Sequence, residues 1–282
     1  MAAAPRVIAV LSHARPQETD AAFAQLLKAT RARGVLVRID EHEAEKHRLS
    51  PGVGLAVGDA AFDVVDVAIA LGGDGTILRA LRRFAGSNVP VFGINYGEVG
   101  FLATVDRDRG QEGLELALSG QFESLKLPAI RIDDGPGAIN DVAITRRAGD
   151  RVAELAYAVS GKEVGRVRCD GVVVATPAGS TGYNLANGGP VLAWGVEGFV
   201  TSFIAPHSLT ARALVAAPDD VLTVHNRSGD PVDISIDGRP LRELAPDATV
   251  TCSFQRDAAD LAMLPGSTFY HRLRETFGRL SS

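Results

Sequence analysis

The chain has 282 residues, of which 46% are hydrophobic and 22% charged, and its 29 basic and 34 acidic residues give a formal net charge of −5. This length predicts two domains or one large one, and the composition excludes a disordered or fibrous chain. The acidic balance argues against a nucleic-acid partner, because phosphate backbones are bound through basic surfaces. Two cysteines are too few for a disulfide framework, and no apolar run reaches the ~18 residues of a membrane helix. We therefore expect a cytoplasmic protein without a membrane partner.

The first hundred residues alternate strand and helix patterns. Short apolar runs typical of buried parallel strands are separated by segments in which apolar residues follow helical spacing. Predicted strands span residues 7–11, 35–39, 64–71 and 89–94, and predicted helices span residues 20–33 and 77–84. The charged segment 41–47 is expected to be a surface loop or a short helix, with His42 and His47 solvated. The alternation with short connections predicts a parallel sheet covered by helices on both faces.

The pattern changes after about residue 120, where short β-rich runs separated by turn residues replace the helical spacing. Predicted strands span residues 153–159, 171–175, 221–225, 232–236 and 249–254, and a predicted helix at 269–280 ends the chain. Such runs favour an antiparallel β domain. The fold class is therefore α/β plus all-β. We predict a Rossmann-like parallel α/β domain over residues 1–120, a β-rich ligand-binding domain over 121–264, and a segment, 265–282, that packs back on the first domain.

The most informative motif is Gly72-Gly73-Asp74-Gly75-Thr76. It stands where a predicted strand passes into a helix, so Asp74 is expected at the carboxyl end of a parallel strand, where open α/β sheets bind ligands. Glycines let backbone N–H groups approach a phosphate, and a helix N-terminus adds partial positive charge. A tight turn with Asp74 or Thr76 as helix cap is the alternative. Three glycines among five residues at this position favour the phosphate site.

Three further stretches have an unusual composition. Residues 95–102 are glycine-rich, and Asn140-Asp141 opens a predicted strand after a turn. The fifteen residues 176–190, which follow Asp170-Gly171 and a strand, are dense in glycine, hydroxyl and amide groups. We expect this last stretch to be a long polar loop that forms no core, and such loops are usually functional or disordered.

Taken together, these motifs resemble those of the NAD kinase family. Gly-Gly-Asp-Gly-Thr alone is shared with phosphofructokinases and diacylglycerol-type lipid kinases, whereas the motif that opens at Thr176 is specific. The resemblance covers nearly the whole chain in the family's order: Gly-Gly-Asp-Gly-Thr at 72–76, Asn-x-Gly-x-x-Gly-Phe-Leu at 95–102, an Asn-acid pair at 140–141, Asp-Gly at 170–171, Thr-Pro-x-Gly-Ser-Thr-x-Tyr at 176–183, Pro-His-Ser-Leu at 206–209 with Arg212, and Asp-Gly at 237–238.

The resemblance implies a two-domain kinase with its site between the domains. Such enzymes move the γ-phosphoryl group of ATP to the 2′-hydroxyl of the adenosine ribose of NAD, and Asp74 would be the base that deprotonates this hydroxyl. The chemistry needs positioning and charge neutralisation, and a carboxylate can accept the proton. The implied substrates are NAD and ATP, with a divalent metal, Mg²⁺, carried by ATP rather than by ligands of the chain. The implied assembly is a homodimer or homotetramer.

The resemblance also implies binding roles. Gly75 and nearby amides would face phosphates, Arg79 would contact the nucleotide or else be solvated, and Asp170 would bind the nicotinamide end. Phe101 is expected either to stack on a base or to pack in the core. The full set of expected binding residues is Gly72, Gly73, Gly75, Thr76, Arg79, Asn95, Phe101, Asn140, Asp141, Arg151, Arg168, Asp170, Ser180, Thr181, Gly182, Tyr183, Asn184, Leu185, Ala186, Ala205 (through its backbone) and Arg239.

Two other functions stay open at this point. A lipid or sugar kinase could share Gly-Gly-Asp-Gly-Thr, but the 140–141 and 176–190 motifs would then have no role. A non-catalytic NAD(P) sensor is disfavoured because Asp74 is present. Three positions depart from the family pattern: Ala178 and Gly182 replace the usual Thr and Ala, and Arg239 stands where Gln is common. The first two changes are expected to be harmless, whereas Arg239 could alter the preference between NAD and NADH or reach a phosphate.

Overall fold

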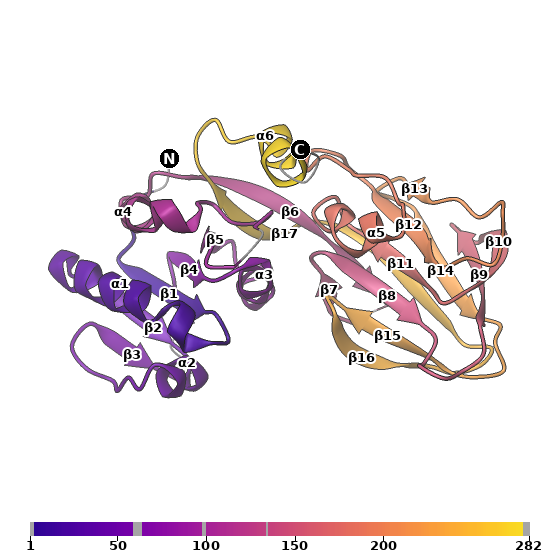
Figure 1. Cartoon of the computed structure of the whole chain (residues 1–282), viewed down its shortest axis with the longest axis horizontal. Helices are drawn as coiled ribbons and strands as arrows, with labels where there is room; N and C mark the ends of the chain where they lie inside the picture. The colour runs from indigo at the N-terminus through magenta and orange to yellow at the C-terminus, as the bar shows by residue number, and fades with distance from the viewer. Residues whose placement is uncertain (1–2, 59–63, 98–99, 134, 279–282) are drawn as a thin grey trace. The chain divides into compact units, whose positions relative to one another are not determined.

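The computed structural model describes residues 3–58, 64–97, 100–133 and 135–278. Glu98 and Val99 of the 95–102 motif, and the end of the predicted C-terminal helix beyond residue 278, lie outside the described residues. The chain divides into two compact units: unit 1 is Met1–Lys126 with Ala259–Ser282, and unit 2 is Leu127–Ala258. Strands β6 (Glu123–Ile132) and β17 (Thr249–Met263) each run from one unit into the other (Figure 1).

Unit 1 is built on a parallel sheet in the order β3-β2-β1-β4-β5-β17. Its other strands are β1 (Val7–Ser12), β2 (Leu36–Ile39), β3 (Leu55–Val57), β4 (Val67–Leu71) and β5 (Pro90–Ile94). The chain fills the sheet from β1 outward to β3 and then returns to place β4 and β5 on the other side of β1. The carboxyl ends of β1 and β4 therefore flank a topological switch point, the usual place for a ligand in an open α/β sheet.

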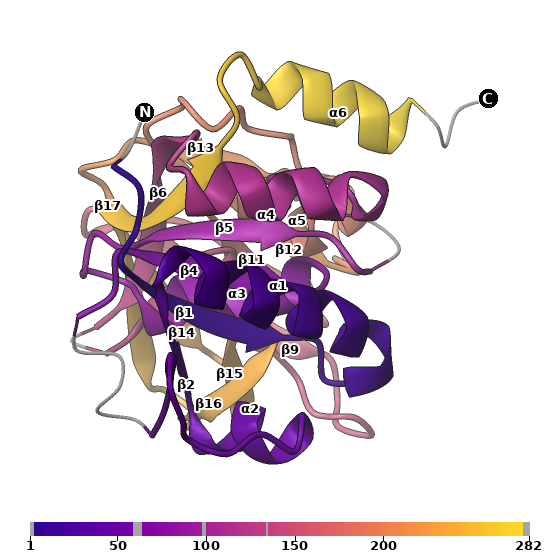
Figure 2. The same ribbon diagram turned by 90° about the vertical axis from the view of Figure 1, so that its left-hand side faces the viewer.

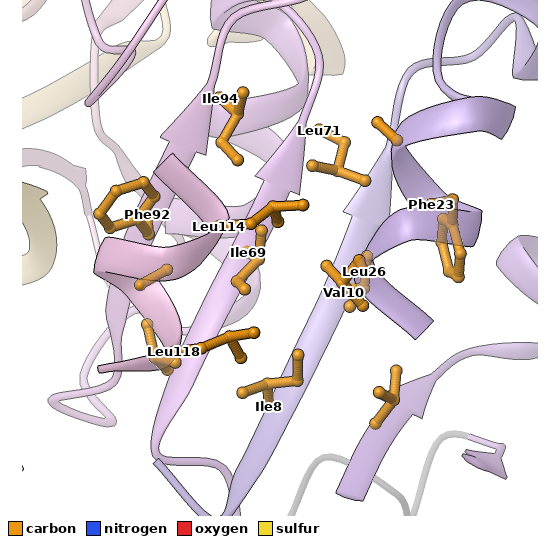
Figure 3. Packing of buried hydrophobic residues seen from close by; sticks show 14 of the residues in the cluster. Ile8, Val10, Phe23, Leu26, Ile69, Leu71, Phe92, Ile94, Leu114 and Leu118 are labelled. Atoms are coloured by element: carbon orange, nitrogen blue, oxygen red, sulfur yellow. The ribbon is translucent and has the colours of Figure 1, made fainter. Parts of the chain in front are cut away.

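Helices cover both faces of this sheet, as the sequence predicts. On one face, Phe23 and Leu26 of α1 (Asp20–Arg33) and Leu114 of α4 (Gly110–Leu118) pack on apolar side chains of the strands (Figure 3). On the other face lies α3 (Asp74–Arg83), whose Ile77 packs against Gly93 of β5. Figure 2 shows α1 and α4 in front of the strands and α3 behind them. Shorter helices are η1 (Pro16–Glu18), α2 (Glu41–Lys46), η3 (Arg107–Arg109) and α6 (Phe269–Phe277).

Unit 2 is antiparallel, which confirms the predicted β domain. One sheet has the order β13-β12-β11-β8-β15-β16, and a second group pairs as β10-β9-β14-β17, with β6 also paired to β17. The strands are β7 (Gly137–Ala138), β8 (Asp141–Thr145), β9 (Ala153–Val159), β10 (Lys162–Cys169), β11 (Gly171–Ala175), β12 (Phe199–Ile204), β13 (Leu214–Ala216), β14 (Val221–Asn226), β15 (Val232–Ile236) and β16 (Arg239–Leu244). Inward residues of both groups, such as Ile144, Val174 and Val224, share one core.

Several predicted bounds differ from the structure. Helix α3 begins at Asp74 rather than residue 77, with Gly73 as its N-cap, so neither Asp74 nor Thr76 caps it. The strand predicted at 64–71 begins at Val67, and the strand predicted at 249–254 continues to Met263. The strand predicted to open at Asn140-Asp141 is β8, whereas helix α4 and the strands β3, β6, β7, β10, β12, β13 and β16 have no counterpart in the sequence prediction. Across the described ranges, no helix combines the length and apolarity required to span a membrane.

The expectation that residues 176–190 form a polar loop without a core is wrong. The segment contains the short helices η4 (Gly179–Thr181) and α5 (Tyr183–Ala186), and Thr176, Ser180 and Asn184 are fully buried. Small polar side chains can be buried when their hydrogen bonds are made locally. The hydroxyl of Ser180 bonds to the backbone of Leu192, and the amide of Asn184 donates to the carbonyls of Ser180 and Pro190.

Candidate functional site

Asp74 stands at the carboxyl end of β4, on the first residue of α3, and its carboxylate is held by backbone amides. Oδ2 accepts from the N–H of Phe101 at 2.9 Å and Oδ1 from the N–H of Leu102 at 3.0 Å. Burial raises the pKa of Asp74, and the two amides and the charge of Arg272 offset part of this rise. The result is a half-buried carboxylate of fixed orientation that is a stronger base than an exposed one.

Glycines bring the 72–76 and 95–102 segments together backbone to backbone. A Cβ atom on Gly97 would lie 3.0 Å from the Cα of Gly73, and a Cβ on Gly72 would lie 2.3 Å from Oγ1 of Thr76. Gly75 is the exception, because a Cβ there would have no neighbour within 4 Å. Its position on the first turn of α3 therefore leaves open space beside the helix N-terminus, where backbone N–H groups attract anions.

Two expected binding residues of this region are engaged inside the protein. The side chain of Asn95 is buried and its Oδ1 accepts from the N–H of Gly97 at 2.9 Å, so it shapes the turn. The ring of Phe101 is 5% exposed and packs against Phe269 and Phe277 of α6, with ring centroids 5.7 and 6.4 Å away. The structure corrects the base-stacking expectation for Phe101, because the ring takes the core-packing alternative.

Arg79 of α3 belongs to a buried cluster of charges around Glu43. Its Nη2 donates to Glu43 Oε1 at 2.7 Å and to the carbonyl of Ser12 at 2.8 Å. Glu43 is 1% exposed and also accepts from the hydroxyl of Ser12 and lies 2.8 Å from Lys46 Nζ. Burial acts to raise the pKa of Glu43, but the bonds from Lys46 and Ser12 outweigh it and the pKa is lowered. Arg79 is thus ion-paired at the carboxyl end of β1, and the solvated alternative is wrong.

His47 also joins this cluster, which contradicts the expectation that it is solvated. Its side chain is only 3% exposed, with Nδ1 2.6 Å from Asp20 and Nε2 2.6 Å from the hydroxyl of Ser12. Glu43 and His47 are four residues apart at the end of α2, so both side chains face the end of β1.

In unit 2, the predicted pair Asn140-Asp141 is positioned by a third residue, Asp237. The carboxylate of Asp237 accepts from the backbone N–H groups of Ile139, Asn140 and Asp141. Asp141 is 9% exposed, and among the described residues no hydrogen bond or ion pair reaches its carboxylate. Burial and the negative charge of Asp237 raise the pKa of Asp141 to about 6. The Oδ1 atom of Asn140 is likewise buried without a partner in the described part of the chain.

The hydroxyl of Tyr183 is close enough to Asp141 and to Asp170 to feel the charge of both. Burial raises the pKa of Tyr183, and the negative charges of Asp141 and Asp170 add to the rise. Asp170 itself is ion-paired with Arg146, whose Nε lies 2.6 Å from Oδ1, and this contact lowers the pKa of Asp170. The fold of unit 2 therefore gathers three of the predicted side chains, from β8, α5 and the turn before β11.

The remaining predicted residues of unit 2 fall into two groups. Ser180, Thr181 and Asn184 make hydrogen bonds within the 176–190 segment and hold its shape. The other group lies wholly or partly at the surface: Arg151, Arg168, Gly182, Leu185, Ala186, Ala205 and Arg239. Ala205 is exposed directly after β12 and has a positive φ of 42°, which is uncommon for a residue other than glycine.

Sequence reasoning missed four side chains that organise these sites: Glu43, Arg146, Asp237 and Arg272. Asp237-Gly238 was recognisable as a family motif, but its task of holding three amides was not. Glu43, Arg146 and Arg272 stand among other charged residues, and each has at least one partner from a distant segment. No group of three or more His, Cys, Asp or Glu side chains suited to a metal ion occurs within the described ranges.

The architecture and the two polar sites define the class of protein: a two-unit kinase with a Rossmann-like unit carrying Gly-Gly-Asp-Gly-Thr. Family models bear this out, since the ATP-NAD kinase N-terminal domain matches residues 18–122 and the ATP-NAD kinase C-terminal domain matches residues 139–262. The chain belongs to the NAD kinase family, whose activity is the ATP-dependent phosphorylation of NAD. This assignment confirms the resemblance seen in the motifs and replaces the lipid-kinase and sugar-kinase alternatives.

Individual relatives agree with the family models. An NAD kinase of Symbiobacterium thermophilum is 36% identical over 260 residues, which cover 89% of this chain and 91% of the relative. NAD kinase 2 of Streptomyces coelicolor is 32% identical, covering 96% and 94% of the two chains. Among solved structures, an NAD kinase from Archaeoglobus fulgidus in complex with ATP has a TM-score of 0.75 at 26% identity and covers 98% of both chains. Yeast NADH kinase complexed with NADH has a TM-score of 0.85 and shares the fold, at 22% identity over 98% and 89% of the chains.

Proposed function

We propose that this chain transfers the γ-phosphoryl group of ATP to the 2′-hydroxyl of the adenosine ribose of NAD, with Asp74 as the proton acceptor. The observation that carries the proposal is the Asp74 carboxylate, held by the N–H groups of Phe101 and Leu102 and of raised pKa. Asp74 takes the hydroxyl proton while the ribose oxygen attacks the γ-phosphorus. The bond from this phosphorus to the β–γ bridging oxygen breaks, and ADP leaves.

The phosphates of ATP are assigned to the start of α3. The open space at Gly75 and the glycine backbone at 72–73 support this assignment, since N–H groups of a helix N-terminus can reach phosphate oxygens there. A divalent cation, Mg²⁺ in the proposal, arrives with ATP as part of the substrate, because phosphates supply most of its ligands.

NAD is assigned to the pair Asn140-Asp141 in unit 2, with Asp170 toward the nicotinamide end. The support is chemical: the Asp141 carboxylate and the Asn140 amide oxygen are acceptors without partners among the described residues, and ribose hydroxyls and an adenine amino group are donors. The surface residues Arg151, Arg168, Ala205 and Arg239 complete the proposed binding set. A cytoplasmic homodimer or homotetramer is proposed on the family resemblance alone, and sedimentation of the purified protein tests the assembly.

The deciding experiment measures NADP formation from NAD, ATP and Mg²⁺ by the wild-type chain and Asp74→Asn. We expect the substitution to lower kcat by about 10²–10⁴-fold, the usual contribution of a general base. A dehydrogenase specific for the 2′-phosphate identifies the product. Calorimetric titration with NAD provides the control, since Asp74→Asn keeps the shape of the side chain and its affinity for NAD should stay within a few-fold.

Three outcomes would overturn parts of the proposal. Wild-type turnover that survives in Asp74→Asn removes the base assignment. Phosphorylation at another hydroxyl removes the regiochemistry. NAD binding without any turnover in the wild type indicates a non-catalytic sensor.

A further inference from the structure

Arg272 reaches from the C-terminal helix into the segment that holds Asp74. It is 8% exposed on α6, and its Nη1 donates to the carbonyl of Phe101 at 3.2 Å and also to the carbonyl of Ala103. Its Nη2 lies 3.8 Å from the sulfur of Met263. A buried guanidinium is costly unless it is hydrogen-bonded, so these contacts fix both the side chain and the segment it touches.

The helix that carries Arg272 is itself anchored on this segment. Thr268 caps α6 by accepting from the N–H of His271 at 3.2 Å, and Phe269 and Phe277 pack on the ring of Phe101. Phe269 and Arg272 are three residues apart and are the two buried residues of α6, so they share its inward face. The helix therefore places the rings of Phe269 and Phe277 and the guanidinium of Arg272 against residues 101–103.

One peptide group connects Arg272 to Asp74. The carbonyl of Phe101 accepts from Arg272, and the N–H of Leu102, which belongs to the same peptide plane, donates to Asp74 Oδ1. In a trans peptide the C=O and N–H bonds point in opposite directions. The plane is thus held between a cation at its oxygen and an anion at its hydrogen, and each contact polarises the group in favour of the other.

The acidic side chains near Arg272 stabilise its charged form, and Arg272 in turn stabilises the charged form of Asp74. Burial lowers the pKa of Arg272, and the negative charges of Asp74 on α3, Asp106 before η3 and Glu275 on α6 oppose this effect. In return, the charge of Arg272 acts against the burial that raises the pKa of Asp74. The guanidinium therefore influences Asp74 in two ways, through the orientation of the Phe101–Leu102 peptide group and through its field.

We propose that Arg272 is a positioning residue for phosphoryl transfer, which fixes the Phe101–Leu102 peptide group so that Asp74 is held ready to receive the proton. The inference rests on the proposed role of Asp74 as base. It assigns the C-terminal helix a part in the reaction, because Arg272 bonds to the peptide group that holds Asp74.

Steady-state kinetics of Arg272→Met and Arg272→Lys test the inference, with Arg274→Met on the exposed side of the same helix as the matched control. Methionine keeps the length of the side chain but donates no hydrogen bond and carries no charge. We expect Arg272→Met to lower kcat by about tenfold to hundredfold, the loss that a small misplacement of a catalytic group produces, with KM for NAD and ATP within about twofold of wild type. Arg272→Lys should recover part of kcat, and Arg274→Met should match the wild type.

The pH profile separates positioning from a purely structural role. Without the cation, the pKa of Asp74 rises further, so the acid limb of the kcat profile should move to higher pH in Arg272→Met and return toward wild type in Arg272→Lys. Arg272→Ala supplies a second test: added guanidinium ion at millimolar concentration should restore part of kcat. If Arg272→Met is poorly folded, Arg272→Lys and the guanidinium rescue still decide the question.

The contrary outcomes are distinct. If Arg272→Met lowers only the yield or the melting temperature, while kcat per folded molecule and the acid limb stay at wild-type values, the positioning inference fails. If Asp74→Asn keeps its turnover, the base assignment fails, and the inference about Arg272 falls with it. If Asp74→Asn is inactive but Arg272→Met is fully active, the inference alone fails and the proposed function stands.

Discussion

The two units of the chain treat their buried carboxylates differently. In unit 1, Asp74 is held by two amides and faces the charge of Arg272, and Glu43 lies among Lys46, Arg79 and His47. In unit 2, Asp141 is buried beside Asp237, and no partner reaches its carboxylate within the described part of the chain. The buried carboxylates of Asp74 and Glu43 thus have hydrogen-bond donors or cations within unit 1, whereas the buried carboxylate of Asp141 has neither within the described part of unit 2.

This difference indicates how each carboxylate meets its ligand. A carboxylate fixed by amides keeps its orientation before the substrate arrives, as a general base requires. A buried carboxylate without donors is costly when ionised, and a ligand that donates hydrogen bonds relieves that cost. Substitutions at Glu43, Asp141 and Gly75 test the comparison, in order of decreasing expected effect on stability.

The largest effect is expected at Glu43, whose removal would leave buried cations uncompensated in unit 1. Glu43→Gln should lower the free energy of unfolding by about 3–5 kcal/mol, the usual result of breaking a buried ion pair. The folded pKa of Glu43 is depressed, so its contribution is present above the unfolded pKa and is lost as the pH falls through the folded pKa. Urea unfolding at pH 7 and in acid should therefore show a difference that shrinks in acid.

Glu45→Gln on the exposed side of α2 is the matched control for Glu43, and we expect its effect to stay within about 0.5 kcal/mol. Equal losses of unfolding free energy in Glu43→Gln and Glu45→Gln would show that the buried charges of unit 1 do not stabilise it by pairing with one another.

At Asp141 we expect the opposite effect on the free energy of unfolding: removing the carboxylate should stabilise the protein at high pH. The folded pKa of about 6 lies above the unfolded value, so the stabilising proton is fully bound below the unfolded pKa and is lost as the pH rises through about 6. Asp141→Asn should therefore stabilise the protein at pH 8 by up to about 3 kcal/mol, at 1.36 kcal/mol for each unit of pKa shift, and leave it unchanged near pH 3. Thermal unfolding at the two pH values measures the effect, and KM for NAD should rise.

Asp237→Asn is the control for Asp141, because the Asp237 carboxylate accepts from three backbone N–H groups. We expect this neighbouring substitution to destabilise the protein at pH 8, where Asp141→Asn stabilises it. If Asp141→Asn destabilises the protein at pH 8, the carboxylate of Asp141 has favourable contacts in the free protein and is not an unpaired buried charge.

The sequence predicted those features whose signal is local. Buried parallel strands are continuous apolar runs, so the α/β unit and the place of Asp74 at the end of β4 could be predicted from composition and order. The strand β12 was missed although it is buried, because it lies beside turn and motif residues that dominate the local pattern.

The features that could not be predicted depend on partners distant in the sequence. Arg272 and the carbonyl of Phe101 are separated by 171 residues, and a backbone acceptor leaves no trace in the residue pattern. Glu43 lies on a six-residue helix and His47 caps its end, and so short a charged run does not reveal which side is buried. The prediction for segment 176–190 was wrong for another reason. A segment rich in glycine, hydroxyl and amide residues can be either an exposed loop or a buried segment with local hydrogen bonds, and composition does not distinguish the two.

The smallest effect on stability is expected for a substitution at Gly75, next to Asp74. This substitution tests the role of the backbone at the start of α3 and leaves the carboxylate of Asp74 unchanged. An added methyl group meets nothing within 4 Å, and alanine is favoured over glycine in a helix by up to about 1 kcal/mol, so Gly75→Ala should leave the melting temperature equal or slightly raised. If phosphates approach this turn, the methyl group crowds them, and loss of one charge-assisted hydrogen bond should raise KM for ATP by about tenfold or more. Gly195→Ala in unit 2, also in open space, should change neither quantity. An unchanged KM for ATP in Gly75→Ala would place the phosphates away from the start of α3, while Asp74 could still act as the base.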